Sequence, residues 1–443
     1  MLNSEDNDMI CRTGRDTPGG KLMRRYWIPA VLGSELPGPD CPPVRVRLLG
    51  EDLVAFRDSS GRVGLLAANC PHRGASLFFG RNEKDGLRCV YHGWKFDVAG
   101  NCVDMPNEPS ESTYKQRIKQ VSYPCIERGR IVWTYMGPET NPPPLPDFQF
   151  LGLPDEQITV IKIYQEQNWL QGIEGSIDPS HAPFLHSAAV DSFQSDAVSA
   201  LRTERIADYY WSTSGWTYDA VDLDYGMMLA AHRQIDDRQN FWRMNVFLLP
   251  FYAMGPVRTG ADPVSNLQAR VPVDDENHFT YSITYHPLRP LTEEEIGFNL
   301  HNVYVVEQGF ENPDPDRPGR EWLLKANKRN DYMLDRHIQR TQTFTGIPGI
   351  AMQDQAVTES MGPIANRTGE HLVRADLGIV MARRVFLRAA RALREGATAP
   401  PGVEGSGYNL RAPSKLLPRA ETNWREALID YYTCLPDRNP SLP

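Results

Sequence analysis

The sequence contains Cys70-Pro71-His72-Arg73-Gly74 and, after a gap, Cys89-Val90-Tyr91-His92-Gly93-Trp94. Each half contributes one thiolate and one imidazole, in the pattern C-x-H followed by C-x-x-H. Zinc fingers usually pair cysteine with cysteine and histidine with histidine, whereas here each half is mixed. The two halves therefore predict a metal site held by two loops, with tetrahedral zinc as the alternative to an iron–sulfur cluster.

Mixed pairing suits a Rieske-type [2Fe–2S] cluster, in which two cysteines bind one iron and two histidines bind the other. Imidazoles in place of two thiolates raise the reduction potential to roughly −150 to +300 mV, so such a cluster accepts electrons from a lower-potential donor. We therefore expect Cys70, His72, Cys89 and His92 to bind the cluster.

Short strands surround both loops. Strand-like runs separated by turn residues occur at residues 44–48, 53–56, 63–66 and 131–134. Strands of this length favour a small antiparallel β domain. It ends near the proline-rich segment 141–146, which can continue neither a helix nor a central strand. We predict that residues 1–150 form the cluster domain, including an N-terminal extension.

The remainder, residues 151–443, mixes strands with helices. Residues 279–285 alternate with period two, as a strand does, and the stretch from about Glu370 to Arg394 has the pattern of a long helix. This mixture predicts an α+β domain in which helices cover an antiparallel sheet. Residues 311–320 are rich in Pro, Asp and Arg and are expected to form an exposed loop.

Composition argues against nucleic acid and membranes as partners. The 443 residues carry a formal net charge of −9, whereas such partners normally need a clustered basic surface. No apolar run approaches the roughly 20 residues of a membrane span, and the first residues lack the pattern of a secretory signal. The seven scattered cysteines are expected to be thiols or metal ligands rather than disulfides. We expect a cytoplasmic protein with a small substrate.

A second group of metal-binding residue types lies in residues 168–186. His181 and His186 are five residues apart, a spacing that does not place both side chains squarely on one face of a regular helix. Pro183 between them suits the first turn of a helix or a distortion, which can bring both imidazoles to one point. Taken alone, such a pair is more often structural than ligating.

Both loops and this run resemble the Rieske non-haem iron aromatic-ring-hydroxylating oxygenases, large (alpha) subunit, of the phthalate dioxygenase-like family. The run fits their motif E-x-x-x-D-x-x-H-x-x-x-x-H, with Glu174, Asp178, His181 and His186 in its positions. Residues 20–29 near the start are similar as well. The resemblance implies a mononuclear Fe(II) centre beside the [2Fe–2S] cluster, in a catalytic domain of helix-grip type.

Two histidines and one carboxylate on one side of an iron leave the opposite positions open for O₂. The resemblance points to Asp354, within residues 351–363, as this carboxylate. Glu359 is the main competitor, and a solvated acid at a helix end is the alternative for Asp354. His181, His186 and Asp354 are thus the expected ligands of the mononuclear iron.

Two further residues have roles implied by the resemblance. Asp178 is expected to join His181 to His92 of a neighbouring subunit, which fixes the orientation of the iron ligand. A homo-oligomer, a trimer or stacked trimers, follows from this link. Asn168 is expected near the iron as a polar pocket residue, and the alternative is a buried amide that caps local backbone.

The function implied is that of the oxygenase component of a multicomponent system. Such a protein dihydroxylates an aromatic carboxylate, either phthalate-type or a substituted benzoate, with O₂ and electrons from an NADH-dependent flavin and [2Fe–2S] reductase. The chain lacks a nucleotide-binding glycine fingerprint, so the reductase is a separate protein. The alternatives are a monooxygenase that performs O-demethylation or aryl-ether cleavage and, more distantly, a Rieske electron carrier without catalysis.

A carboxylate substrate predicts at least one arginine in the pocket, because a planar guanidinium binds a carboxylate through two hydrogen bonds. Arg243 is the main candidate, since it lies in the apolar, strand-like run 240–247, where an unpaired charge is costly. Arg205 is a weaker candidate, as is Arg202. For each of them a surface salt bridge is the alternative.

Overall fold

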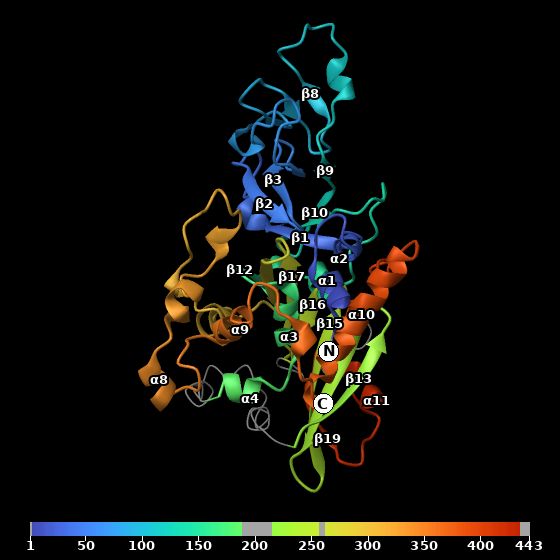
Figure 1. Ribbon diagram of the computed structural model, residues 1–443, viewed down its shortest axis with the longest axis vertical. Coiled ribbons are helices and arrows are strands. Elements are labelled where there is room, and N and C mark those ends of the chain that lie inside the picture. The colour runs from blue at the N-terminus through green and yellow to red at the C-terminus, as the bar shows by residue number, and fades with distance from the viewer. Residues whose placement is uncertain (1, 188–214, 257–261, 435–443) are drawn as a thin grey trace.

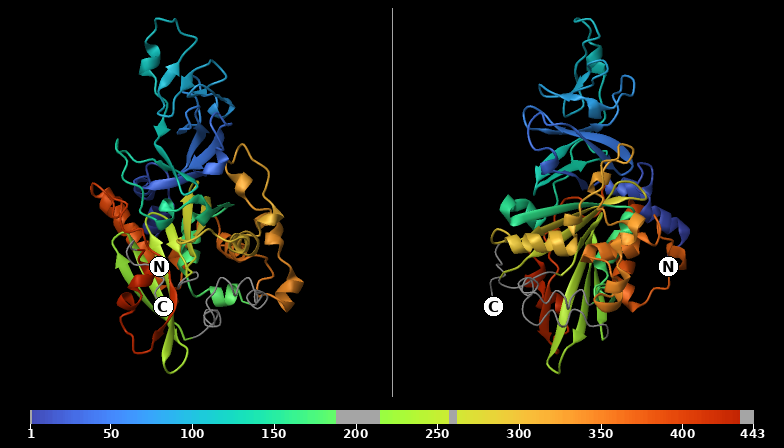
Figure 2. Two further views of the ribbon diagram at one scale, coloured as in Figure 1. Left: turned by 180° about the vertical axis from the view of Figure 1, so that it is seen from behind. Right: turned by 90° about the vertical axis from the view of Figure 1, so that its left-hand side faces the viewer.

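The computed structural model describes residues 2–187, 215–256 and 262–434. Figure 1 shows the small sheets of the N-terminal part at one end of the long axis and the larger, mixed part at the other. The same stacking is visible in both views of Figure 2. The predicted α+β class is confirmed, with an N-terminal β part followed by a part in which helices cover a large antiparallel sheet.

Three antiparallel sheets form the N-terminal part. Their strand orders are β1-β11-β10, β2-β3-β4-β9 and β5-β6-β7-β8. The bounds are Trp27–Leu32 (β1), Val44–Leu48 (β2), Glu51–Arg57 (β3), Val63–Ala67 (β4), Arg81–Asn82 (β5), Leu87–Arg88 (β6), Lys95–Phe96 (β7), Cys102–Asp104 (β8), Ser122–Tyr123 (β9), Cys125–Arg128 (β10) and Ile131–Tyr135 (β11). The four predicted strands are confirmed as β2, β3, β4 and β11.

The turn between β2 and β3 shows how the sequence sets this register. Leu49 and Gly50 connect the two strands, and their φ angles are 49° and 80°. Two successive residues with positive φ match a type I′ turn, whose twist fits that of an antiparallel hairpin. Gly50 adopts this conformation without steric cost because it lacks a Cβ.

A large antiparallel sheet forms the centre of the second part. Its order is β12-β18-β17-β16-β15-β14-β13, and β19 pairs with β15. The bounds are Ile158–Gln165 (β12), Thr217–Leu223 (β13), Gly226–Gln234 (β14), Gln239–Leu248 (β15), Tyr252–Met254 (β16), Ser265–Pro272 (β17), His278–Tyr285 (β18) and Ser414–Pro418 (β19). The strand predicted over residues 279–285 is confirmed as β18, and all of its residues are buried. Both faces of the sheet are therefore covered there.

Helices cover this sheet. Helix α3 packs on β15, β16 and β17, α10 packs on β13 and β14, and α9 packs against α3. The bounds are Ser4–Cys11 (α1), Pro18–Met23 (α2), Trp169–Ile177 (α3), Ala182–Leu185 (α4), Glu293–Gly297 (α7), Arg336–Thr341 (α8), Ile350–Glu359 (α9), Leu377–Arg394 (α10), Trp424–Ala427 (α11) and Ile429–Tyr432 (α12). None of the described helices is long and apolar enough to cross a membrane.

The helix predicted from about Glu370 begins later, at Leu377. Two carboxylates explain the difference. Glu370 turns away to accept hydrogen bonds from the guanidinium of Arg383 at 2.6 and 2.8 Å, and Asp376 accepts one from the N–H of Val373 at 2.7 Å. These contacts hold the preceding residues outside the helix. The predicted loop over residues 311–320 has no helix or strand before its last residue.

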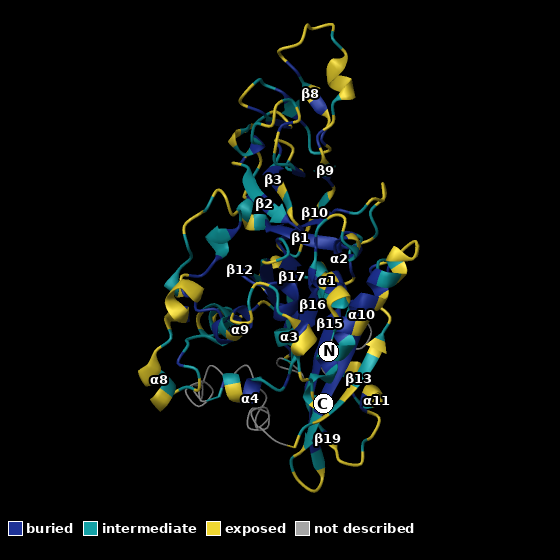
Figure 3. Ribbon diagram, in the orientation of Figure 1, coloured by how far each residue is buried: buried dark blue, intermediate teal, exposed yellow. Residues whose placement is uncertain are grey.

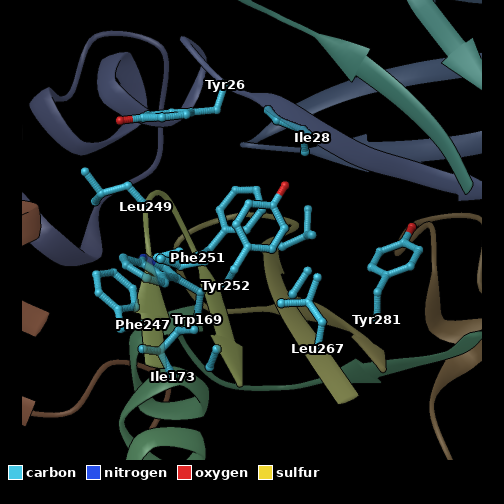
Figure 4. Close-up of a cluster of buried hydrophobic side chains, with 14 of the residues drawn as sticks. Tyr26, Ile28, Trp169, Ile173, Phe247, Leu249, Phe251, Tyr252, Leu267 and Tyr281 are labelled. Carbon is cyan, nitrogen blue, oxygen red and sulfur yellow. The ribbon is translucent and has the colours of Figure 1, made fainter. Parts of the chain in front are cut away.

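The hydrophobic core runs across the boundary between the two parts. Figure 4 shows Ile28 of β1 above Tyr252, Leu267 and Trp169 of the second part. The hydroxyl of Tyr252 also donates to the carbonyl of Trp27 at 3.1 Å. The segment before β1 belongs to the same core, because α1 and α2 pack on α10. Figure 3 shows burial concentrated around the large sheet, with exposed residues toward α8 and around the β8 end.

Candidate metal centres and active-site cavity

Two loops of the same shape present the cysteines and histidines of the first centre. In each loop, the cysteine N–H donates to a carbonyl five residues later, at 2.8 Å in both cases. The glycine four residues after the cysteine then donates its N–H back to the cysteine carbonyl, at 2.9 Å for Gly74 and 3.0 Å for Gly93. Both glycines have positive φ, 76° and 78°, which favours glycine. A local hydrogen-bond ring thus sets each loop.

The four side chains fit a [2Fe–2S] cluster. Cys70 and Cys89 are buried and form no disulfide, and the rings of His72 and His92 lie 4.5 Å apart between centroids. The Nδ1 atom of His72 is buried and has no hydrogen-bond partner among the described residues, which a structural histidine rarely tolerates. Trp94 stacks on the His72 ring at 4.4 Å. The site thus holds an imidazole nitrogen that a metal would satisfy.

The Cys70 thiol of this site resists ionisation. Burial is the main cause that raises the pKa of Cys70 to about 11, and the charge of Cys89 beside it acts in the same direction, although a backbone hydrogen bond opposes both. Metal binding requires the thiolate form, so the protons leave when the metal is bound.

A one-turn helix brings His181 and His186 together. They flank α4, with His181 at its start and His186 at its end. Pro183 lies in the first turn, as predicted, where a missing N–H is harmless. The two rings are 5.2 Å apart between centroids and inclined by 80°. The five-residue spacing therefore does allow both imidazoles to face one point.

Asp354 of α9 completes a group of three ligand types. Its Oδ1 atom lies 3.3 Å from Nε2 of His181 and 3.2 Å from Nε2 of His186. One donor atom from each of the three residues lies within 4.8 Å of the others. Two imidazoles and a carboxylate that converge in this way suit the facial triad of non-haem Fe(II) enzymes.

Each histidine has its own orienting partner. Nε2 of Gln353 donates to the carbonyl of Ile347 at 2.9 Å, so its Oε1 faces Nδ1 of His186 at 2.8 Å and accepts a hydrogen bond from it. The carboxylate of Asp178 likewise lies 3.3 Å from Nδ1 of His181. Both rings therefore carry a proton on Nδ1 and present Nε2 to the shared point, which is the tautomer that a metal needs.

The charged forms of His181 and Asp354 stabilise one another. Burial alone lowers the pKa of His181, but hydrogen bonds with Asp178 and Asp354 outweigh it and raise the pKa to about 10. Burial raises the pKa of Asp354, but the positive charges and hydrogen bonds of His186 and His181 lower it below its usual range. Any metal that binds here displaces a proton from His181, so its affinity depends on pH.

Helix α9 is tied to α3, the helix that leads to the histidines. The side-chain amide of Gln171, on α3, donates to the carbonyls of Thr358 and Gly362, both at 2.9 Å. These carbonyls lie in the last turn of α9 and just beyond it. The bonds therefore fix the position of Asp354 relative to His181.

Glu174, the first residue of the sequence motif, holds α3 from the opposite side. It accepts hydrogen bonds from Arg367 at 2.8 Å and from Arg383 of α10 at 2.7 Å. Burial raises the pKa of Glu174, but the two guanidinium charges outweigh it and keep the group ionised. Glu174 is therefore a structural member of the motif that orients the helix.

Glu359 has other partners. It is buried and accepts hydrogen bonds from the N–H of Glu166 at 2.9 Å, from Gln355 at 2.6 Å and from the hydroxyl of Tyr332. Burial raises its pKa. The structure brings Asp354, and not this competitor, to the two histidines.

Asn168 also has a position other than the expected one. It is buried at the N-terminus of α3, where its Oδ1 caps the N–H of Leu170 at 3.1 Å. Its Nδ2 donates to the carbonyls of Cys11 and Asp275, at 2.9 and 2.7 Å. It is not among the described residues that line the cavity, because backbone groups occupy its amide. This correction matches the alternative, a buried amide that caps local backbone.

A cavity of about 230 Å³ lies beside the histidines and Asp354. Arg243 of β15 lines it, as predicted, and is 3% exposed. Arg205 and Arg202 lie outside the described residues. Six amide side chains also line the cavity: Gln165, Gln167, Asn245, Asn266, Gln268 and Gln355.

Arg270 of β17 is a further lining residue, which the sequence reasoning missed. The sequence pattern around Arg270 resembles that around Arg243. Arg270 is a charged residue between Ala269 and Val271 in a strand-like run. Two more residues were overlooked, Gln353 and Gln171, because single amides give no pattern in a sequence.

Comparisons with known proteins agree with this geometry. Residues 26–122 match the Rieske [2Fe-2S] domain family, and residues 134–433 match the family described as LigXa C-terminal domain like. Over 439 residues the chain is 39% identical to the 3-chlorobenzoate-3,4-dioxygenase oxygenase subunit of Comamonas testosteroni, covering 96% of this chain and 98% of that protein. It is 35% identical over 451 residues to the phthalate 4,5-dioxygenase oxygenase subunit of Pseudomonas putida, covering 99% and 98%.

The fold is also that of solved oxygenases. The terminal oxygenase of carbazole 1,9a-dioxygenase from Novosphingobium sp. KA1 superposes with a TM-score of 0.54 at 18% identity, covering 88% of this chain and 96% of that one. At this identity the likeness supports the fold alone.

The first prediction concerns the carboxylate of the mononuclear site. Asp354→Asn removes the charge that faces both histidines, so we expect iron to fall from about three to about two per chain while the visible absorption of the cluster persists. The matched control on the same helix is Glu359→Gln, which should keep about three. Iron analysis and absorption spectra on both proteins check this. Equal iron loss in the two variants would contradict the assignment.

The second prediction concerns the Cys89 loop. A Cβ on Gly93 would lie 2.6 Å from Cγ of Pro106, and the φ of Gly93 is 78°. Gly93→Ala should therefore reduce the cluster absorption per chain. Gly61→Ala is the control, because Gly61 has a φ of 81° but open space around its Cβ position. If both variants lose cluster equally, the close packing of this loop is not the cause.

The two loops, the three converging ligand types and similarity over nearly the full length lead to one conclusion. The chain belongs to the Rieske non-haem iron aromatic-ring-hydroxylating oxygenases as an alpha-type oxygenase subunit, a family whose members use a [2Fe–2S] cluster and a mononuclear iron.

Proposed function

We propose that this oxygenase dihydroxylates an aromatic carboxylate, either a substituted benzoate or a phthalate-type acid. The observation that carries the proposal is a cavity beside His181, His186 and Asp354 that is lined by two buried arginines, Arg243 and Arg270. Relatives named for 3-chlorobenzoate and phthalate support it. Both atoms of O₂ enter neighbouring ring carbons, and two electrons and two protons balance the reaction, so the product is a cis-dihydrodiol.

We assign the cluster to residues 1–150, with Cys70, His72, Cys89 and His92 as ligands, and the mononuclear iron to residues 151–443, with His181, His186 and Asp354. When bound, the cluster supplies electrons and the iron activates O₂.

The protein's own groups prepare the substrate for this chemistry. Asp178 orients the imidazole of His181, and Gln353 orients that of His186. Arg243 lines the cavity and donates to the carbonyl of Pro179 at 3.4 Å, and we propose that it also donates to the substrate carboxylate. Arg205 is proposed as a second contact.

Electron transfer is proposed to cross a subunit boundary. Within one chain the segment of the cluster loops lies between β3 and β8, in the upper half of the view in Figure 1, whereas α4 lies in the lower half. Val90 and Tyr91, beside His92, are 57% and 55% exposed. A second copy can cover them, and Asp178 then joins His181 to His92 of that copy. In a trimer, or in stacked trimers, every subunit can make this contact with a neighbour.

The electron donor is proposed to be an NADH-dependent flavin and [2Fe–2S] reductase, since relatives are oxygenase subunits of multicomponent systems. The cytoplasm is the proposed location, because none of the seven cysteines, all of which lie in the described residues, forms a disulfide, as in a reducing compartment.

A second candidate is monooxygenation, by O-demethylation or aryl-ether cleavage. It is favoured by a 30% identity to the 5,5'-dehydrodivanillate O-demethylase oxygenase subunit of Sphingobium over 93% of this chain. The same cavity serves either reaction, because the outcome depends on which carbon faces the iron.

The third prediction identifies the substrate class. With a reductase and NADH, the holoenzyme should consume O₂ and form a cis-dihydrodiol with at least one of benzoate, the three phthalate isomers and the chlorobenzoates. A phenol released from phenoxybenzoate or a methoxylated acid would favour the second candidate. The absence of turnover with every aromatic acid would overturn the substrate class.

The fourth prediction tests the subunit boundary. His181→Ala removes an iron ligand and Cys89→Ser removes a cluster ligand, so each variant alone should be inactive. Co-expressed, they should recover part of the wild-type rate, because a subunit with an intact cluster can then face one with an intact iron site. Chains that transfer electrons internally would recover no activity. A mixture of two His181→Ala preparations serves as the control.

A further inference from the structure

Arg270 is a buried cation whose hydrogen-bond partners among the described residues are all neutral. It lies on β17, is 8% exposed and lines the cavity. Its Nη1 donates to Oε1 of Gln165 at 3.0 Å and to the hydroxyl of Thr280 at 2.6 Å. Its Nη2 donates to the hydroxyl of Ser176 at 2.9 Å and to Oε1 of Gln268 at 2.8 Å. Its two Nη groups thus have acceptors, whereas its buried Nε has no hydrogen-bond partner among the described residues, and its charge is not neutralised.

Three other buried arginines, Arg24, Arg367 and Arg383, have carboxylate partners. Arg367 and Arg383 both bind Glu174 through ion pairs shorter than 3 Å. Within the described ranges, Arg270 has no ion pair with a carboxylate. Burial is the cause that lowers its pKa, and the nearby charge of Asp354 only partly offsets it. A buried charge in this state is costly unless an opposite charge approaches it.

The carboxylates around the cavity already interact with the two histidines. Asp354 faces His181 and His186, and Asp178 faces His181. These are the two acidic side chains among the described residues of the cavity lining. The described part of the lining therefore offers Arg270 no carboxylate that does not already face a histidine, and a divalent iron would add positive charge.

The guanidinium of Arg270 is also held by contacts with several elements. Its four acceptors come from β12, α3, β17 and β18, so it is held from several directions. Gly172 of α3 lies directly against it, because a Cβ at that position would be 3.0 Å from Cδ of Arg270. The side chain cannot turn toward water without the loss of these contacts.

We propose that Arg270 selects for an anionic substrate by its fixed charge, with the substrate carboxylate as its counter-ion. The inference rests on the proposed function and deepens it. Arg243 and Arg270 then have different roles in substrate binding. Arg243 donates hydrogen bonds to the carboxylate, whereas Arg270, whose Nη groups all bind protein acceptors, acts through the electrostatic potential at the cavity. It is a specificity-determining residue.

The fifth prediction compares an acid with its neutral isostere. Calorimetry on the anaerobic holoenzyme measures the binding of benzoate and benzamide to the wild type, Arg270→Gln and Arg270→Lys. The Gln variant can still reach some of the neutral acceptors but has no charge. We expect it to lower the preference for benzoate over benzamide about tenfold or more, and the Lys variant to keep most of it. Benzamide binding should change little.

Several outcomes would overturn the inference. One is an unchanged preference in folded Arg270→Gln, and another is equal loss of both ligands. Failure of the wild type to bind benzoate is a third. If the melting temperature shows that Arg270→Gln is unfolded, the Lys variant decides, because loss of the preference there contradicts a role for charge. The proposed function fails separately, when the wild type binds aromatic acids but turns none over.

Discussion

The attachment of α3 to α9 and α10 is the constraint on which the rest of the catalytic part depends. Glu174 holds α3 to two arginines, and Gln171 holds it to the end of α9. Loss of one partner in a buried ion pair leaves an uncompensated charge, so these contacts resist displacement. Because α3 leads to His181 and α9 carries Asp354, the spacing of the metal ligands is set by the packing of two helices and does not require a rigid loop.

The two histidines of this site differ in their surroundings. The side chain of His186 is 5% exposed and is oriented by Gln353 from within, whereas that of His181 is 25% exposed and is oriented by Asp178. Asp178, beside the more exposed His181, is therefore in a position that suits a contact with another subunit. The neutral amide of Gln353 suits the buried surroundings of His186. In the described lining of the cavity, both carboxylates face a histidine, whereas the printed hydrogen bonds of Arg270 go to neutral acceptors.

Local patterns were predictable and distant contacts were not. The cluster loops could be predicted because four ligands lie within two short segments, and β2 could be predicted from alternation and a turn. Asp354 was reached only by resemblance, since its partners lie far away in the sequence. Asn168 was placed near the iron, but the chain uses it to cap α3, because backbone carbonyls from two distant segments meet its amide. Arg270 was missed because its proposed role depends on the lack of a carboxylate partner among the described residues, which only the folded chain reveals.

The central claim is that one protein holds both an electron store and an oxygenating iron site. The most direct test is a single turnover without any reductase. The chemically reduced holoenzyme is mixed with ¹⁸O₂ and an aromatic acid, and the products are analysed by mass spectrometry. The account predicts an oxygenated acid that contains ¹⁸O, with two labelled atoms if the reaction is dihydroxylation. Oxidation of the cluster without any labelled product would contradict it and would favour an electron carrier.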